Sequence, residues 1–310
     1  MSRRSSLIRL LAILGITAIW GWTFVVVKDA IAAFPVAAFL AYRFALAVAL
    51  WTPFMRHLRW RSVLAGAWIG VFMGLAFVVQ TLGLHLTLAS DAGLITGLFV
   101  VLVPAIEWLV FRVRVPRIML AGVASALLGL ILLIGALPRQ LAIGDLLVAL
   151  SALGFAVQII LVARFSHHHD SISLTVGQTV SALAVFILAA LVPMGGGFPL
   201  PSPSVLVAIA ITASLATALG LFVQVWAQRQ LAATTSAIVL LTEPAWATFF
   251  GVWLSGNPFP PIRIAGAALL FATPVFVTLA ALRPRRRTAI AQVPKPVGDE
   301  RADPEVALAG

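Results

Sequence analysis

The sequence contains no cysteine among its 310 residues, and charged residues are scarce. Without cysteine, disulfides, thiol chemistry and cysteine-ligated metal sites are excluded. Only 10% of the residues are charged, whereas a soluble domain carries about 25%. At the same time 62% of the residues are hydrophobic. This composition predicts a polytopic membrane protein with little sequence left for a soluble domain.

Two further kinds of site are missing or weakly represented. No phosphate-binding loop of the form G-x-x-x-x-G-K-[ST] occurs, and neither lysine, Lys28 or Lys295, follows a glycine. ATP-driven pumping by this chain is therefore not indicated. The run His167–Asp170 contains three histidines and an acid, but adjacent residues do not readily converge on one ion. We expect a solvated loop there, no metal site, and no cofactor.

Hydrophobic stretches separated by short polar breaks fill most of the chain. An apolar helix of roughly 20 residues crosses the bilayer core. Ten stretches of about this length occur, at 10–27, 36–54, 63–84, 92–110, 118–137, 146–162, 174–192, 205–226, 232–254 and 264–282. The predicted fold class is an all-α integral membrane protein with ten transmembrane helices.

The net charge of +11 would suit nucleic-acid binding, but the basic residues fall mainly on one side of the predicted membrane topology. If the N-terminus lies inside the cell, seventeen basic residues fall on cytoplasmic ends and loops, and three, Lys28, Arg139 and Arg263, fall on the other side. This is a strong positive-inside pattern. We expect a multi-pass protein of the plasma or inner membrane with both termini cytoplasmic. Lipid is an expected partner and nucleic acid is not; the oligomeric state is left open.

The pattern of the first half begins again after the fifth stretch. The segment PRIMLAG at 116–122 recurs as PPIRIAG at 260–266, which indicates a duplication of five helices. Because five is odd, the copies must insert with opposite orientation, and such inverted repeats are typical of secondary transporters. The predicted domains are a first repeat at 1–137, a second at 138–282, and a basic, disordered tail at 283–310.

An acid followed by a proline, Glu243 and Pro244, lies in the middle of the ninth stretch. A charged acid at mid-membrane costs roughly 2.5–3.5 kcal/mol on insertion scales. Pro244 has no N–H, so the carbonyl of Leu240 loses its helical partner and a kink is expected. We predict that both residues line a polar cavity, where Glu243 exchanges a proton or faces the amine of a substrate. The alternative is an acid paired with a neighbouring helix for assembly.

Five more residues are candidates because of their position within the spans. Arg43 lies inside the second span, where it needs a partner or water unless it snorkels to the outer interface. Trp20 and Trp22 lie deep in the first span, away from the interface that tryptophans usually occupy; they line a cavity or pack in the core. Phe155 and Gln178 are 23 residues apart, as Trp20 and Arg43 are, and are their counterparts in the second half.

Gln80, near the outer end of the third span, and Trp246, three residues after Glu243, complete the candidate set. Glu107 lies near the cytoplasmic end of the fourth span, close to Arg112 in sequence. We expect these two charges to form an interfacial ion pair.

Glycines mark where helices should approach one another closely. Gly66, Gly70 and Gly74 recur every four residues in the third span, a ridge of small residues that predicts tight helix packing. Gly21 should let a neighbouring helix approach the first span in the same way.

The order and spacing of several motifs resembles the EamA repeat of the drug/metabolite transporter superfamily. The first half contains Trp20-Gly21-x-x-Phe24-Val25-x-x-Lys28, then Pro35 and Arg43-Phe44. The second half contains Gly144-Asp145-Leu146, Gln178, and Ala227-Gln228-x-x-x-Ala232 before Glu243-Pro244. The resemblance covers about residues 8–282. Phe155 departs from it, because relatives often have Trp at that position.

The resemblance implies a transporter whose cavity lies between the halves, lined by the first, third and fourth helices of each repeat. We predict a secondary-active transporter that exports small metabolites, amino acids or amphipathic compounds, by alternating access, and not an enzyme. An integral membrane enzyme would need clustered acids or histidines, and the spans offer only Glu107 and Glu243. A channel or receptor is the other alternative, but two inverted halves suit alternating access better.

Overall fold

The computed structural model describes residues 3–32, 34–84, 86, 95–134, 143–192, 196–255 and 260–281. Within these ranges the chain is all helical and contains no strand. The helices are α1 (Arg3–Ile31), α2 (Val36–Leu50), η1 (Thr52–His57), α3 (Trp60–Leu84), α5 (Phe99–Leu109), α6 (Arg117–Ile134), α7 (Ile143–Phe165), α8 (Ser171–Leu191), α9 (Pro203–Ile211), η2 (Thr212–Leu219), α10 (Gly220–Gln228), α11 (Ala233–Leu240), α12 (Glu243–Ser255) and α13 (Pro261–Ala281). The predicted tail, 283–310, lies outside the described residues.

The helices have the length and surface of membrane spans. Within the described ranges six segments are long and apolar enough to cross a membrane: Trp60–Gly83, Arg117–Ile134, Ile143–Phe165, Ser171–Leu191, Pro203–Gln228 and Pro261–Ala280. Shorter apolar helices cover Leu7–Thr23, Val36–Leu50 and Phe99–Leu109. On the outside of the bundle Trp68, Trp253 and Phe276 are 66%, 70% and 61% exposed. Such an apolar exterior fits a bundle surrounded by lipid, so the predicted all-helical membrane class is confirmed, while the count of ten spans stays a prediction.

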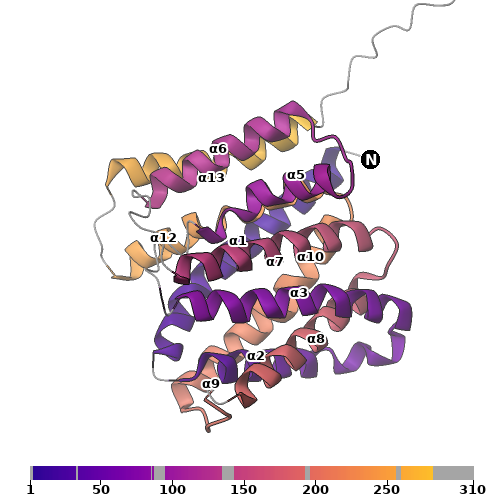
Figure 1. Ribbon diagram of the computed structural model, residues 1–310, viewed down its shortest axis with the longest axis vertical. Helices are drawn as coiled ribbons and strands as arrows, with labels where there is room; N and C mark the ends of the chain where they lie inside the picture. The colour runs from indigo at the N-terminus through magenta and orange to yellow at the C-terminus, as the bar shows by residue number, and fades with distance from the viewer. Residues whose placement is uncertain are drawn as a thin grey trace, which may run out of the picture.

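The glycine ridge of α3 packs tightly against a neighbouring helix, as predicted, and that helix is α8. A Cβ added to Gly70 would collide with the backbone carbonyl of Gln178 and the hydroxyl of Ser181, and one on Gly66 or Gly74 would also meet α8. In Figure 1, α3 lies between α7 and α8. Because these glycines have no side chain, the axes of α3 and α8 can approach one another closely.

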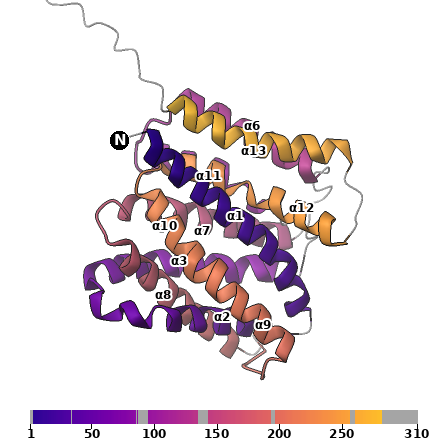
Figure 2. The same ribbon diagram turned by 180° about the vertical axis from the view of Figure 1, so that it is seen from behind.

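The two copies of the repeated segment begin α6 and α13, which lie side by side in Figures 1 and 2. Gly122 near the start of α6 contacts Val277 near the end of α13, and Gly266 near the start of α13 contacts Leu133 near the end of α6. Each residue of the second contact lies 144 positions from its counterpart in the first. The two matched helices therefore pack antiparallel through equivalent contacts.

We predict that Gly70→Ala destabilises the protein, because the new methyl group has no space between α3 and α8. Overpacking of this kind costs about 1–3 kcal/mol. Gly15→Ala is the matched control, because nothing lies within 4 Å of a Cβ at Gly15. Thermal unfolding in detergent should show a lowered midpoint for Gly70→Ala and an unchanged or raised midpoint for Gly15→Ala. Equal midpoints would show that the ridge does not set the packing.

Candidate functional site

The helix that carries Glu243 is broken at that residue. Helix α11 ends at Leu240 and α12 begins at Glu243. Between them the N–H of Thr242 bonds to the carbonyl of Val239 at 3.0 Å, a tighter turn than an α-helix makes. Pro244 falls in the first turn of α12, where its missing N–H has no intrahelical partner to lose. The predicted interruption is confirmed, and it places the acid at the start of a helix.

Helix α1 packs directly against this break. The hydroxyls of Thr17 and Thr242 are 2.9 Å apart and both side chains are fully buried. One turn further along α1, a Cβ on Gly21 would lie 2.5 Å from the Cβ of Trp246. Gly21 thus permits the close approach that its sequence context predicted.

Arg43 has a hydrogen-bond partner within the protein. Its Nε donates a hydrogen bond of 2.6 Å to the hydroxyl of Thr217 on η2, and its guanidinium carbon lies 5.8 Å from the centroid of the Phe44 ring. This contact gives Arg43 a partner inside the protein, and the snorkelling alternative stays a prediction. Thr217, in turn, is a residue that sequence reasoning missed.

Arg43 and Glu243 carry opposite charges that interact electrostatically, but the two side chains do not form an ion pair. Each is the opposite charge that acts on the other, yet no ion pair joins them among the described residues. Both side chains are surrounded by protein, and both nevertheless retain accessible surface.

The tryptophans take different positions around the site. Trp20 donates from Nε1 to the carbonyl of Ala216 on η2 at 2.8 Å. Trp246 packs edge-on against Phe271 with ring centroids 4.8 Å apart, and its Nε1 is buried without a hydrogen-bond partner among the described residues. Trp22 is half-buried and points away from Trp20, because two residues turn a helix by roughly 200°.

Phe155 is linked to the site by a line of aromatic rings. Phe155 packs edge-on against Phe77 at 5.1 Å, Phe77 against Phe186 at 6.2 Å, and Phe186 against Phe44 at 4.8 Å. Phe44 is the neighbour of Arg43 in sequence. The line therefore runs from α7 across α3 and α8 to α2.

The two glutamine candidates do not join the Arg43–Glu243 cluster. Gln80 donates to the hydroxyl of Thr96 at 3.0 Å. Gln178 is fully buried between α8 and α3, and neither its amide nitrogen nor its amide oxygen has a partner in the part of the chain that the structure describes. Its equivalence to Arg43 is therefore one of sequence position only.

The expected ion pair between Glu107 and Arg112 is not present. Glu107 instead accepts a hydrogen bond of 2.6 Å from the hydroxyl of Thr234 on α11. Arg112 follows the end of α5 in a turn with a φ of 52°, and its side chain is exposed. The turn separates the two charges, because Glu107 faces the neighbouring helix whereas Arg112 faces outward.

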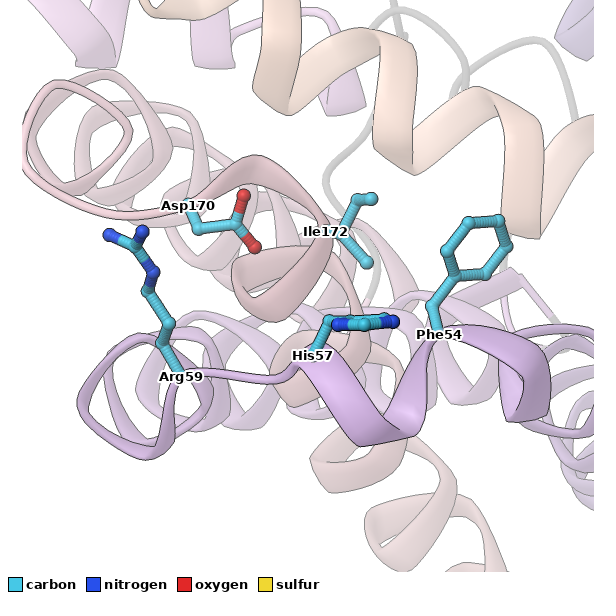
Figure 3. A pocket seen from close by; sticks show the side chains of 5 residues that line it. All are labelled: Phe54, His57, Arg59, Asp170 and Ile172. Carbon is cyan, nitrogen blue, oxygen red and sulfur yellow. The ribbon is translucent and has the colours of Figure 1, made fainter.

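A surface cavity of about 180 Å³ lies at the junction of η1, α3 and α8 and is lined by Phe54, His57, Arg59, Asp170 and Ile172. Figure 3 shows Arg59 and Asp170 at one end and Phe54 at the other. Asp170 already caps α8, accepting from the N–H and the hydroxyl of Ser173 at 2.8 Å each. The cavity contains none of the predicted site residues.

Sequence reasoning did not find the η2 segment, Thr212–Leu219, which is a π-helix. A π turn holds more residues than an α turn, but it leaves the apolar composition of a span unchanged. The available signals were the run of threonines and serines in this span and Gly220 just after it.

Comparisons with known proteins agree with this arrangement. The sequence profile described as the EamA-like transporter family matches residues 7–135 and 142–279. A protein from Archaeoglobus fulgidus described as "Uncharacterized transporter" is 32% identical over 276 residues, which cover 87% of each chain. A solved structure described as "Crystal structure of protein" superposes with a TM-score of 0.71 at 20% identity, covering 90% of this chain and 98% of the other. That last likeness concerns the fold alone.

Proposed function

The chain belongs to the EamA-like transporter family, and from this premise we propose that it is a secondary-active transporter that exports small metabolites by alternating access. The family points to transport rather than to enzymatic activity. Amino acids and amphipathic compounds are the proposed substrates. Their charged groups complement Arg43 and Glu243, and their apolar parts complement the neighbouring aromatic rings.

The observation that carries this proposal is the separated pair of opposite charges. An ion pair that served assembly alone would gain most from direct contact, because buried charges are stable only when closely paired. Arg43 and Glu243 instead interact electrostatically but form no ion pair among the described residues. A substrate with one acidic and one basic group would complete both pairings, whereas a proton on Glu243 would remove one charge from the empty site.

The arrangement of the repeats supports alternating access. Arg43 belongs to the first EamA match and Glu243 to the second, so the proposed site lies between the halves. The antiparallel packing of α6 and α13 is what two oppositely inserted five-helix repeats, in a ten-span bundle, require. Inverted repeats meeting at a central site are a recurring construction among secondary transporters, in which one half rocks against the other.

We further propose that the protein lies in the plasma or inner membrane with both termini cytoplasmic, because of the bias in its basic residues. The absence of native cysteine allows a direct test with single substitutions Ser2→Cys, Ser202→Cys and Thr288→Cys. An impermeant thiol reagent applied to intact cells should label only the Ser202→Cys variant. Labelling of the other two variants, with Ser202→Cys unlabelled, would reverse the topology.

We predict that Glu243→Gln folds normally but transports poorly. The substitution preserves shape and removes the charge; charge-assisted hydrogen bonds contribute about 1.5–3 kcal/mol, so apparent affinity should fall roughly tenfold or more. Glu107→Gln is the matched control, because Glu107 already bonds to Thr234. The measurement is counterflow of radiolabelled L-amino acids, and of ethidium as an amphipathic cation, in proteoliposomes.

Unchanged flux and pH profile in a well-folded Glu243→Gln variant would exclude Glu243 from the transport site. A structural role would give the reverse pattern, a lowered melting temperature with intact flux. If the wild-type protein moved none of these probes faster than protein-free vesicles do, transport of small metabolites would itself be contradicted.

A further inference from the structure

The π-helix η2 connects α9 and α10 within one continuous helical segment. In an α-helix the N–H of Gly220 would bond to the carbonyl of Ala216, four residues earlier. Here it bonds to the carbonyls of Leu215 and Thr217 instead. The carbonyl of Ala216 is therefore left without its usual donor. Such π turns are rare and are often found at functional sites.

The carbonyl of Ala216 receives the indole of Trp20. Nε1 of Trp20 donates to it at 2.8 Å, and a Cβ on Gly220 would lie only 2.6 Å from that same nitrogen. The position of the indole thus depends on two features, the carbonyl of Ala216, which does not accept from the N–H of Gly220, and the absence of a side chain at Gly220.

The next residue, Thr217, holds Arg43. The hydrogen bond of 2.6 Å uses Nε of the guanidinium, and Thr217 is 1% exposed. Arg43 forms no other hydrogen bond within the described ranges. Its two Nη groups, with four of the five N–H donors of the guanidinium, are therefore available to Glu243 and to a ligand.

We propose that η2 positions two site residues of the first repeat, Trp20 and Arg43, and that Thr217 is the positioning residue for Arg43. Fixing Nε determines where the remaining edge of the planar guanidinium points. This inference rests on the proposed function, because the role of Arg43 is to present its charge to a substrate beside Glu243. The inference adds one specificity-determining contact, the hydrogen bond from Arg43 to Thr217. Thr217 itself carries no charge.

The test compares Thr217→Val, which removes the hydroxyl at nearly constant shape, with Thr217→Ser, which keeps it. Thr212→Val is the matched control. Thr212 is also fully buried in η2, but its hydroxyl donates only to the backbone carbonyls of Ala208 and Ile209. A melting curve for each variant separates a loss of fold from a loss of positioning.

The first readout needs no substrate. Because the chain has no native cysteine, Glu243→Cys introduces a single thiol at the position that interacts electrostatically with Arg43. A neighbouring guanidinium favours the thiolate, which is the form that reacts with N-ethylmaleimide. Adding Thr217→Val to this background should slow alkylation at neutral pH by roughly threefold or more. Adding Thr217→Ser or Thr212→Val should leave the rate unchanged. Equal rates with Thr217→Val and without it would overturn the inference, whether or not the protein transports.

The second readout is counterflow of radiolabelled L-phenylalanine, which carries an acid, an amine and an aromatic ring. Thr217→Val should raise KM with little change in the maximal rate, and Thr217→Ser should restore the wild-type KM. Equal KM values for Thr217→Val and Thr212→Val would contradict the positioning role while leaving the proposed function intact.

Discussion

The constraint on which the structure depends is the presence of two opposite charges among apolar helices. A charge in hydrocarbon is stable only if protein or water replaces its hydration. Arg43 obtains part of this from the hydroxyl of Thr217, and Glu243 lies where a helix starts and the helix dipole favours an acid. What remains unsatisfied is the direct pairing of the two charges. An interaction left incomplete in a low-dielectric interior is energetically strong when a ligand completes it.

The two irregular turns follow from the same constraint. The break between α11 and α12 and the π turn η2 both depart from the hydrogen-bond pattern of a regular α-helix. Non-helical backbone at membrane depth is tolerated only where other protein groups or a cavity satisfy it. Trp20 satisfies one such carbonyl, and Thr17 contacts Thr242 at the other turn. Helix α1 therefore contacts both irregular turns.

Much of the fold could be predicted from the sequence, because apolar runs, glycine ridges and proline act locally. The all-helical membrane class, the tight packing at Gly70 and the break before Pro244 depend on few residues, and the structure confirms each of them. The partners of charged side chains could not be predicted in this way. Arg43 meets Thr217, which is 174 positions away, and Glu107 meets Thr234 rather than the nearby Arg112. Such pairings depend on how the two halves pack, and no periodicity within a single span encodes them.

The central claim is that Arg43 and Glu243 act on the same substrate as one site shared by the two repeats. A double-mutant cycle measures this directly, with KM for L-phenylalanine counterflow determined for the wild type, Arg43→Gln, Glu243→Gln and the double variant. If the charges act together, the double variant should lose no more affinity than the more strongly impaired of the two single variants, because removal of one charge already disables the site. Losses that multiply in the double variant would show two independent residues and contradict a shared site.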